Sequence, residues 1–307
     1  MFVLLPNYIL NLDESINLFG IGYLLKNVHN KYNKELREEF KKIVHPSTYY
    51  YWLSNKSPIK IKYLKIFINY DNIIEDVYKK VNYFSVNRKK VVLPKEFTSD
   101  LAYLIGVMHG DGHISKNLRN MDISEEELHF HILIKKLFKN IFHDNVSITK
   151  CKLEKQYKSF ISSRVISSFF RLFCPTGKKK GKLKVPQIIK NNKHLLKEYL
   201  SGFFDTDGCL PHLEVKGKKS RNYFIFSQAH KDIVFEIYDC LKNLNLDINE
   251  PKEFKSPTEP YANNRDLIEW KISINDRPTL KKFFKIIKFR HLSKKKRADI
   301  IIKNLGS

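Results

Sequence analysis

The sequence predicts an α+β protein in which two similar half-domains of the order αββαββα follow a mainly helical N-terminal domain. Three observations lead to this expectation. A run of apolar residues that ends in Asp-Gly occurs twice in the same register, at 101–112 and at 199–208. Helical and strand-like hydrophobic patterns follow each copy in the same order. The first 92 residues differ in composition from the rest, with Lys, Asn and Tyr on the polar faces of expected helices.

The first domain, residues 1–92, is expected to be helical and to end in a basic linker. Ser15 can cap a helix that runs through Leu18 to Val28, and a second helix is expected over 34–43. The segment 46–58 begins Pro-Ser-Thr and ends Asn-Lys-Ser-Pro, which are start and stop signals for a short helix. The basic stretch 87–95 ends near a Pro and is typical of a linker.

The short helix in 46–58 resembles the recognition helix of a helix-turn-helix domain. In such domains early exposed residues reach the major groove, while an aromatic residue anchors the helix to the core. A plain helical bundle around Trp52 is the alternative. The candidate DNA contacts are Ser47, Thr48, Tyr49 and Tyr50, with Lys56 on phosphate.

The two half-domains are expected at 93–194 and 195–307. In the first, the motif helix is followed by strands within 112–123, a helix over 126–142, strands over 146–153 and 156–161, and a helix over 165–173. In the second, strands are expected near 209–215 and 222–227, a helix over 231–244, strands near 248–254 and 267–274, a helix over 277–287 and a closing helix.

Each copy of the motif has the chemistry of a cation site at a helix end. The last carbonyls of a helix lack intrahelical partners, and the negative end of the dipole favours a cation. Asp111 and Asp207 add carboxylates to the carbonyls of Gly110 and Thr206, a hard-oxygen set that suits Mg²⁺ or Ca²⁺. Small residues four apart on one face let the two helices approach closely, and two adjacent carboxylates then call for a metal.

This pair of motifs closely resembles the signature of the LAGLIDADG homing endonucleases, over roughly residues 93–303. In that family the final Asp of each motif binds the catalytic metal. The resemblance therefore implies that Asp111 and Asp207 are catalytic metal ligands for Mg²⁺, with Ca²⁺ or Mn²⁺ able to substitute in binding. The family also places a basic residue beside each metal. The candidates are Lys179 in the first half and Lys294 or Lys296 in the second.

The resemblance also implies that the two sheets form a saddle in the major groove of double-stranded DNA. Most basic residues on it are expected to contact phosphate or solvent rather than to read bases. The candidate contacts are Lys116, Arg119, Lys150, Lys152, Lys155, Lys158, Lys216, Lys218, Arg221, Gln228, Lys252, Lys255, Arg265 and Lys271.

Composition agrees with a nucleic-acid partner. The 307-residue chain carries 56 Lys and Arg against 32 Asp and Glu, a formal net charge of +24, which favours a polyanion such as DNA. No apolar run is long enough to span a bilayer, and residues 1–12 lack the features of a signal peptide. The four cysteines form no Cys-x-x-Cys pair. We therefore expect a cytoplasmic protein with reduced thiols and no membrane partner.

The sequence thus predicts a monomeric, single-chain endonuclease that cuts both strands of a long, asymmetric DNA site. Two alternatives use the same scaffold. One is a regulator that binds DNA without cleaving it, since a fold does not determine an activity. The other is a maturase whose basic surface binds intron RNA.

Overall fold

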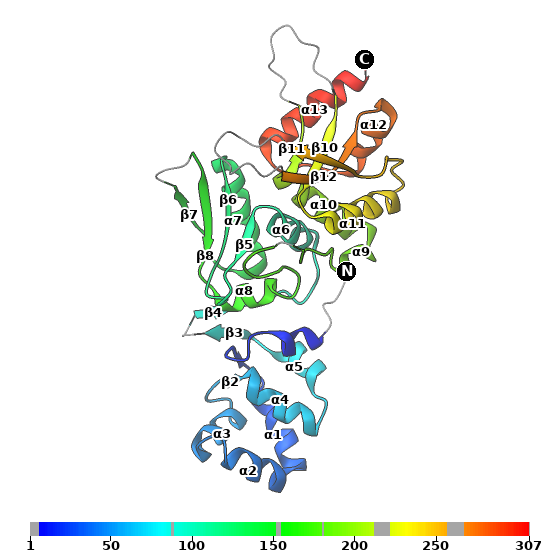
Figure 1. Ribbon diagram of the computed structural model, residues 1–307. Helices are drawn as coiled ribbons and strands as arrows, with labels where there is room; N and C mark the ends of the chain where they lie inside the picture. Colours follow the sequence, from blue (N-terminus) through cyan, green and yellow to red (C-terminus); the bar gives the residue numbers. More distant parts are fainter. Residues whose placement is uncertain are drawn as a thin grey trace.

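The computed structural model describes residues 6–86, 89–151, 155–179, 181–211, 222–256 and 267–306. Figure 1 shows three parts stacked along the length of the molecule: an N-terminal module at the bottom, the first half-domain above it and the second half-domain at the top. Among the described residues the strands form three antiparallel sheets of four strands each, one per part. The predicted α+β class is confirmed.

The N-terminal module is mainly helical, as predicted, and also contains a small sheet of order β2-β1-β3-β4. Figure 1 shows α2 and α3 at its far end and β3 and β4 beside the first half-domain. Its elements are the 3-10 helix η1 (Pro6–Asn11), β1 (Asn17–Phe19), α1 (Gly22–Lys31), α2 (Asn33–Lys41), α3 (Pro46–Leu53), β2 (Ile59–Lys60), α4 (Ile61–Tyr70), α5 (Ile74–Lys80), β3 (Tyr83–Val86) and β4 (Lys89–Val91).

Two expectations for this module are wrong. The helix predicted from Ser15 begins only at Gly22, because the preceding residues form β1, which pairs with both β2 and β3. Gly20, with φ +91°, makes the turn between β1 and α1. The stretch predicted as a linker contributes β4, which pairs with β3. The module is therefore continuous with the chain that leads into the first half-domain.

The first half-domain has the predicted order αββαββα. Thr98 caps its first helix by accepting a hydrogen bond from the backbone N–H of Leu101 at 3.2 Å. The sheet order is β5-β6-β8-β7. The elements are α6 (Ser99–His109), β5 (Gly112–Ile114), β6 (Met121–Glu125), α7 (Leu128–Phe142), β7 (Ser147–Lys150), β8 (Tyr157–Ile161) and α8 (Arg164–Phe170).

The second half-domain repeats this order, with the corresponding sheet order β9-β10-β12-β11. Asn192 caps its first helix by accepting from the N–H groups of His194 and Leu195 at 2.9 and 3.1 Å. The elements are α9 (Gln187–Lys190), α10 (Lys193–Asp207), β9 (Gly208–Cys209), β10 (Phe224–Gln228), α11 (Lys231–Asn243), β11 (Lys252–Ser256), β12 (Leu267–Ile274), α12 (Arg277–Ile286) and the closing α13 (Leu292–Gly306).

The helices α6 and α10 join the two halves by crossing backbone against backbone. A Cβ on Gly106 would overlap the Tyr199 carbonyl, and one on Gly202 would overlap the Tyr103 carbonyl. Glycine at both positions therefore allows a closer approach than any other residue would. The side chains around the crossing are almost fully buried, so these two helices form the centre of the core.

The N-terminal module is packed directly onto the first half-domain. The backbone N–H of Asp13 donates to Ser168 Oγ on α8 at 2.7 Å, and the rings of Tyr8 and Phe169 meet edge to face at 5.7 Å. The Arg171 guanidinium donates to the Asn11 carbonyl at 3.0 Å. These contacts hold the module against α8.

No helix among the described residues is long and apolar enough to cross a membrane.

Candidate active site

Asp111 and Asp207 come together because α6 and α10 are still in contact at their C-terminal ends. Asp207 is the last residue of α10, and Asp111 follows Gly110, the C-cap of α6. A Cβ on Gly110 would overlap Thr206 Oγ1 and would lie 3.0 Å from Asp207 Oδ1. The structure thus brings together the two carboxylates that the repeated motif singles out.

The surroundings of the two acids disfavour their charged forms. Burial raises the pKa of Asp207 to about 7, and the neighbouring Asp111 adds to the rise. The protein packed around Asp111 raises its pKa as well, although its side chain reaches solvent, while Lys179 and Lys294 act against that rise. Such a pair of carboxylates gains stability from any cation that binds between them.

A lysine lies at the end of each of these helices. The Lys179 ammonium donates to the carbonyls of His109, at 3.0 Å, and Gly110. The Lys294 ammonium donates to the carbonyls of Phe204 and Thr206, at 3.1 and 2.8 Å. Burial lowers the pKa of both ammonium groups, and the nearby aspartates oppose that shift. In both halves the lysine therefore donates to the carbonyl just before the final Asp, Gly110 in one and Thr206 in the other. The second carbonyl differs, since His109 stands two residues before its Asp and Phe204 stands three before.

The third lysine candidate, Lys296, is exposed on α13 and has no hydrogen bond or ion pair with another described residue. Of the two alternatives predicted for the second half, the structure therefore places Lys294, and not Lys296, at the helix end beside Asp207.

The donors at this point fit a hard divalent cation. The carboxylates of Asp111 and Asp207 and the carbonyls of Gly110 and Thr206 are oxygen donors of the kind that Mg²⁺ prefers. The ammonium groups of Lys179 and Lys294 already donate to those two carbonyls, and each carbonyl keeps a second lone pair for a metal. Nowhere in the described parts of the chain do three His, Cys, Asp or Glu side chains converge on one point, so a metal here would depend on backbone oxygens and on water or a bound partner for further ligands.

Each half is hydrogen-bonded to the segment that carries the other half's active-site lysine, which is 289–294 in the second half and 173–179 in the first. We call the two tyrosine hydrogen bonds that make these connections the crossed bonds. The Tyr103 hydroxyl, from α6, donates to Asp205 Oδ2 on α10 at 2.6 Å. The same carboxylate accepts from the backbone N–H groups of Arg290 and His291, at 2.8 and 3.0 Å, just before Lys294. A tyrosine of the first half therefore helps to position the lysine of the second half.

The reciprocal contact uses a histidine in place of the aspartate. His109 Nδ1 lies 2.8 Å from the Tyr199 hydroxyl of α10, and its Nε2 lies 3.0 Å from the Phe173 carbonyl, in the segment that leads to Lys179. Burial lowers the pKa of His109 to about 4, so the ring is neutral near pH 7 and can both donate and accept. His109 therefore acts as a link between segments.

Gln228 and Glu125 occupy equivalent positions at the ends of β10 and β6, as the pairings of Gly208 with Phe226 and of Gly112 with Ile123 show. The Gln228 amide donates to Asp207 Oδ2, so this residue faces the acids and not the open face of the sheet. That placement corrects its prediction as a groove contact. Glu125 instead lies 3.2 Å from His291 Nε2 in the other half.

The contact residues predicted in the N-terminal module divide by exposure. Ser47, Tyr50 and Lys56 are exposed, and Thr48 is half-buried. Tyr49 is a core residue: its hydroxyl lies 2.8 Å from His29 Nδ1, and only 3% of the side chain is exposed. The prediction that Tyr49 contacts DNA is wrong, because one face of α3 packs against α1 and α2.

The register of the sheets sorts the predicted strand contacts. Lys252 and Lys271 are paired neighbours on the open face of the second sheet. Lys158 lies on the open face of the first sheet, 3.2 Å from Asp122 Oδ2. Thr149 pairs with Lys158 and therefore shares its open face. Because successive side chains of a strand point to opposite faces, Lys150 is directed away from the open face.

Lys255 is exposed on β11, where it pairs with Ile268 and so lies on the opposite side of the strand from Lys252. The remaining candidates lie in turns, as exposed Lys155 does between β7 and β8, or outside the described residues. The Lys116 side chain packs against Gly177, in the turn that leads to Lys179. Arg119 is exposed in the turn between β5 and β6. Lys152, Lys216, Lys218, Arg221 and Arg265 lie outside the described residues.

The sequence reasoning missed the tyrosines and overlooked the part played by their partners. Tyr103 and Tyr199 each stand eight residues before the final Asp of their motif, and His109 and Asp205 each stand two residues before it. The repeat itself therefore contained the signal, since positions that match in both copies and carry polar atoms in buried helices need partners.

Comparisons with known proteins give weak similarities. No protein-family model matches the chain. A glutamine–fructose-6-phosphate aminotransferase from Methanocaldococcus jannaschii is 26% identical over 219 residues, which cover 70% of this chain and 18% of that protein. The ribonucleoside-diphosphate reductase NrdEB subunit alpha of Bacillus subtilis is 24% identical over 222 residues, or 62% of this chain and 19% of that protein. The chain spans less than a fifth of these relatives.

Similar solved structures include I-DmoI in complex with DNA and Ca, at a TM-score of 0.40 and 15% identity over 63% of this chain and 91% of that one. A K262A mutant of I-SmaMI has a TM-score of 0.42 and 13% identity, covering 68% and 91%. Full-length DUF199/WhiA from Thermatoga maritima has a TM-score of 0.43 and 13% identity, covering 67% and 60%.

Proposed function

We propose that this chain is a metal-dependent DNA endonuclease of the LAGLIDADG type that cuts both strands of a long, asymmetric site. The observation that carries the proposal is the pair of acid–lysine sites at the ends of α6 and α10. Asp111 with Lys179 and Asp207 with Lys294 repeat one constellation in two halves. Two equivalent sites in one chain would allow it to hydrolyse one strand at each.

Asp111 and Asp207, with the carbonyls of Gly110 and Thr206, would hold Mg²⁺. Bound Mg²⁺ would supply a more acidic water and would stabilise charge on the leaving oxygen. The protein's own groups do the rest. Lys179 and Lys294 bring positive charge to the place where negative charge develops on the phosphate, and the surrounding protein strengthens that interaction. The crossed bonds from Tyr103 and Tyr199 hold the two lysine segments in place.

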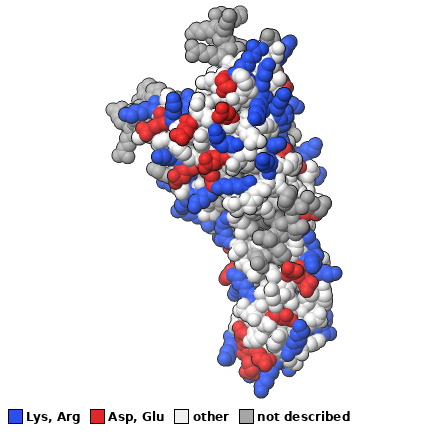
Figure 2. All heavy atoms as spheres, turned by 90° about the vertical axis from the view of Figure 1, so that its right-hand side faces the viewer, with Lys and Arg blue, Asp and Glu red and all other residues white. Residues whose placement is uncertain are grey.

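The DNA partner is supported by charge and by the lysines on the open sheet faces. The chain has a formal net charge of +24. Lysine and arginine side chains that neutralise phosphates release the counterions held by DNA, and this release favours binding. Lys252, Lys271 and Lys158 lie on open sheet faces. Figure 2 shows basic side chains interleaved with acidic ones from top to bottom of the face in view, so on this face there is no single basic stripe. In the N-terminal module, exposed Ser47, Tyr50 and Lys56 on and after α3 would contact DNA in a helix-turn-helix manner.

The test is a cleavage selection on a library of genomic duplexes in Mg²⁺, followed by assays on the selected site. We expect Asp111→Asn and Asp207→Asn each to abolish double-strand cleavage, while duplex binding in Ca²⁺ is largely retained. Full cutting by Asp207→Asn would contradict the proposed mechanism. Binding to a palindrome without cleavage would instead support a regulator, and selective binding to intron RNA would support a maturase.

A further inference from the structure

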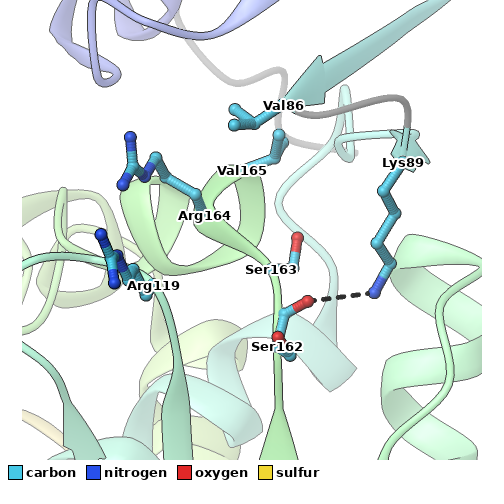
Figure 3. Close-up of a pocket in the computed structure, with 7 residues that line it drawn as sticks. All are labelled: Val86, Lys89, Arg119, Ser162, Ser163, Arg164 and Val165. Atoms are coloured by element: carbon cyan, nitrogen blue, oxygen red, sulfur yellow. Dashed lines mark hydrogen bonds between the residues drawn. The ribbon is translucent and has the colours of Figure 1, made fainter.

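A pocket of about 380 Å³ opens at the seam between the N-terminal module and the first half-domain. The module contributes β3 and β4, and the half-domain contributes the β5–β6 turn and the start of α8. Val86 and Val165 close the apolar side of the pocket. The polar lining residues are Lys89, Arg119, Ser162, Ser163 and Arg164 (Figure 3). We call this site the seam pocket.

The charges of the seam pocket are all of one sign. Three of its lining residues, Lys89, Arg119 and Arg164, are cationic, and no described lining residue is acidic. Figure 3 shows the side chains of Arg119 and Arg164 pointing to the same side, with Lys89 reaching down from the opposite side. Cations gathered around an open pocket attract an anion with several acceptor oxygens.

Much of this positive charge is free to bind a ligand. The Arg119 guanidinium has no acidic partner within the described residues, and its side chain is exposed. Arg164 donates from one nitrogen, Nη1, to Ser15 Oγ at 3.4 Å. Its charge acts together with the Ser15 hydrogen bonds to lower the pKa of the Asp13 carboxyl, so part of that charge already faces an acid. A guanidinium carries five donors, which leaves others for a ligand. Lys89 is more fully engaged, since its ammonium lies 2.7 Å from Asp144 Oδ2 and donates to the Ser162 carbonyl at 3.3 Å. Arg119 and Arg164 are therefore the groups that would bind an anion.

The position of the seam pocket, between two parts that are both expected to contact DNA, favours a nucleic-acid backbone over a small anion as its ligand. The module is packed on α8 through Asp13, Tyr8 and Arg171 and is not joined by a free linker. A duplex that contacts both the module and the first sheet must therefore cross the seam, which is where Arg119 and Arg164 lie. Arginine side chains bind phosphodiester oxygens well, because the planar fork matches two acceptors at once.

We propose that the seam pocket holds backbone phosphates of the bound DNA duplex, through Arg119 and Arg164, so that the module and the first half-domain share one continuous DNA track. This inference rests on the DNA-binding part of the proposed function and is independent of cleavage. It assigns no base reading to the seam pocket, because phosphate contacts position a duplex without specifying its sequence.

The experiment measures the salt dependence of binding to a random-sequence duplex long enough to cover both parts, with the full chain in Ca²⁺. Arg119→Gln/Arg164→Gln should lower the slope of log Kd against log salt by about 2, since each phosphate contact contributes roughly 0.9. Arg119→Gln alone should lower it by about 1. Because Arg119 lies in an exposed turn, this single variant remains informative if loss of Arg164 loosens the seam. The matched control is Lys281→Gln/Lys282→Gln, which removes two exposed charges from α12.

The seam pocket proposal stands if the arginine variants lose slope and the control does not. Equal slopes in all variants would overturn it. A loss of slope seen only with duplex RNA would overturn the assignment to DNA. A saturable rise in Tm with inorganic phosphate that requires both arginines, with an unchanged DNA slope, would make the pocket a small-anion site. Cleavage is scored separately, so a chain that never cuts DNA but shows the slope change would lose the proposed function and keep this inference.

Discussion

Lys294 and Lys296 stand two positions apart on α13 but have different surroundings. Lys294 donates to the carbonyls of Phe204 and Thr206, whereas Lys296 is exposed to solvent. Sequence spacing could not separate them, since both lie in one basic run. Only the direction of α13 relative to α10 decides which lysine meets the acids.

Replacing Lys294 by Met should therefore slow cleavage by about a hundredfold or more, because a positive charge aimed at developing phosphate charge is lost. Lys296→Met is the matched control and should cleave at nearly the wild-type rate. The measurement is single-turnover cleavage of the selected site at saturating protein. Equal rates for the two variants would remove Lys294 from the site.

Asp207 should make stability depend on pH and on metal. Its pKa is about 7 in the folded chain and near 3.8 when unfolded, so the native state binds the proton more tightly. Its contribution to stability is then full below the unfolded pKa and is lost as pH rises towards 7. Without metal, Asp207→Asn should therefore be more stable than the wild type at pH 8, with a higher Tm. The gain in the free energy of unfolding should be on the order of 1 kcal/mol or more. At pH 5 the gain should be smaller.

Mg²⁺ should act in the opposite direction, since it competes with the proton for the carboxylate. We expect Mg²⁺ to raise the Tm of the wild type at pH 8 and to lose that effect below about pH 6. The Asp207→Asn variant should show little response at either pH. A wild-type Tm that ignores Mg²⁺ at pH 8 would argue against a metal at this place.

At the scale of elements, the crossing of α6 and α10 organises the site. The crossing could be predicted from sequence, because Gly106 and Gly202 occupy the same place in two copies of one motif. The crossed hydrogen bonds could not. They depend on which helix face meets which, and on segments such as 289–291 that carry no periodic pattern of their own.

Removing either tyrosine hydroxyl should slow the cleavage of one DNA strand more than that of the other. Tyr103→Phe loosens Asp205 and the segment before Lys294, while Tyr199→Phe loosens His109 and the segment before Lys179. Each loss leaves a buried acceptor, Asp205 Oδ2 or His109 Nδ1, short of a donor, at a cost of about 1–3 kcal/mol. We expect nicked intermediates to accumulate on opposite strands in the two variants.

The assay for this prediction is strand-specific end labelling of the selected site. Tyr238→Phe, on α11, is the control, because its ring packs partly buried against the core and its hydroxyl takes no part in the crossed bonds. If both tyrosine variants slowed the same strand, or slowed neither, the crossed bonds would have no role in positioning the lysines.

At the scale of the whole molecule, the two halves are alike in topology and unlike in detail. His109 corresponds to Asp205, and Glu125 corresponds to Gln228. The sequence predicted the order of elements in both halves well, because helices and strands there have strong periodicity. In the N-terminal module it predicted α2 and α3 but missed the small sheet, because strands such as β1 and β4 are short and form only by pairing with other strands.

Because both acids lie on one chain, we expect a monomer whose footprint is long, asymmetric and centred on the cut. Two unlike halves can read two unlike half-sites, whereas a symmetric dimer would require a palindrome. Light scattering and a footprint on the selected site provide the measurement. A stable dimer on an inverted repeat, left uncut in Mg²⁺, would contradict this expectation and favour the regulator.

The crossing has a consequence for the origin of the chain. Each half supplies one glycine to the contact between the helices. Each half also supplies one tyrosine hydroxyl and one side chain that accepts a hydrogen bond from the other half's tyrosine. These are Tyr103 and His109 in the first half, and Tyr199 and Asp205 in the second. Two copies of either half could therefore satisfy the same contact with each other. The architecture is what gene duplication and fusion of a homodimeric ancestor would leave behind, and bonds such as Arg290 to Asp100, at 2.6 Å, now join the fused halves.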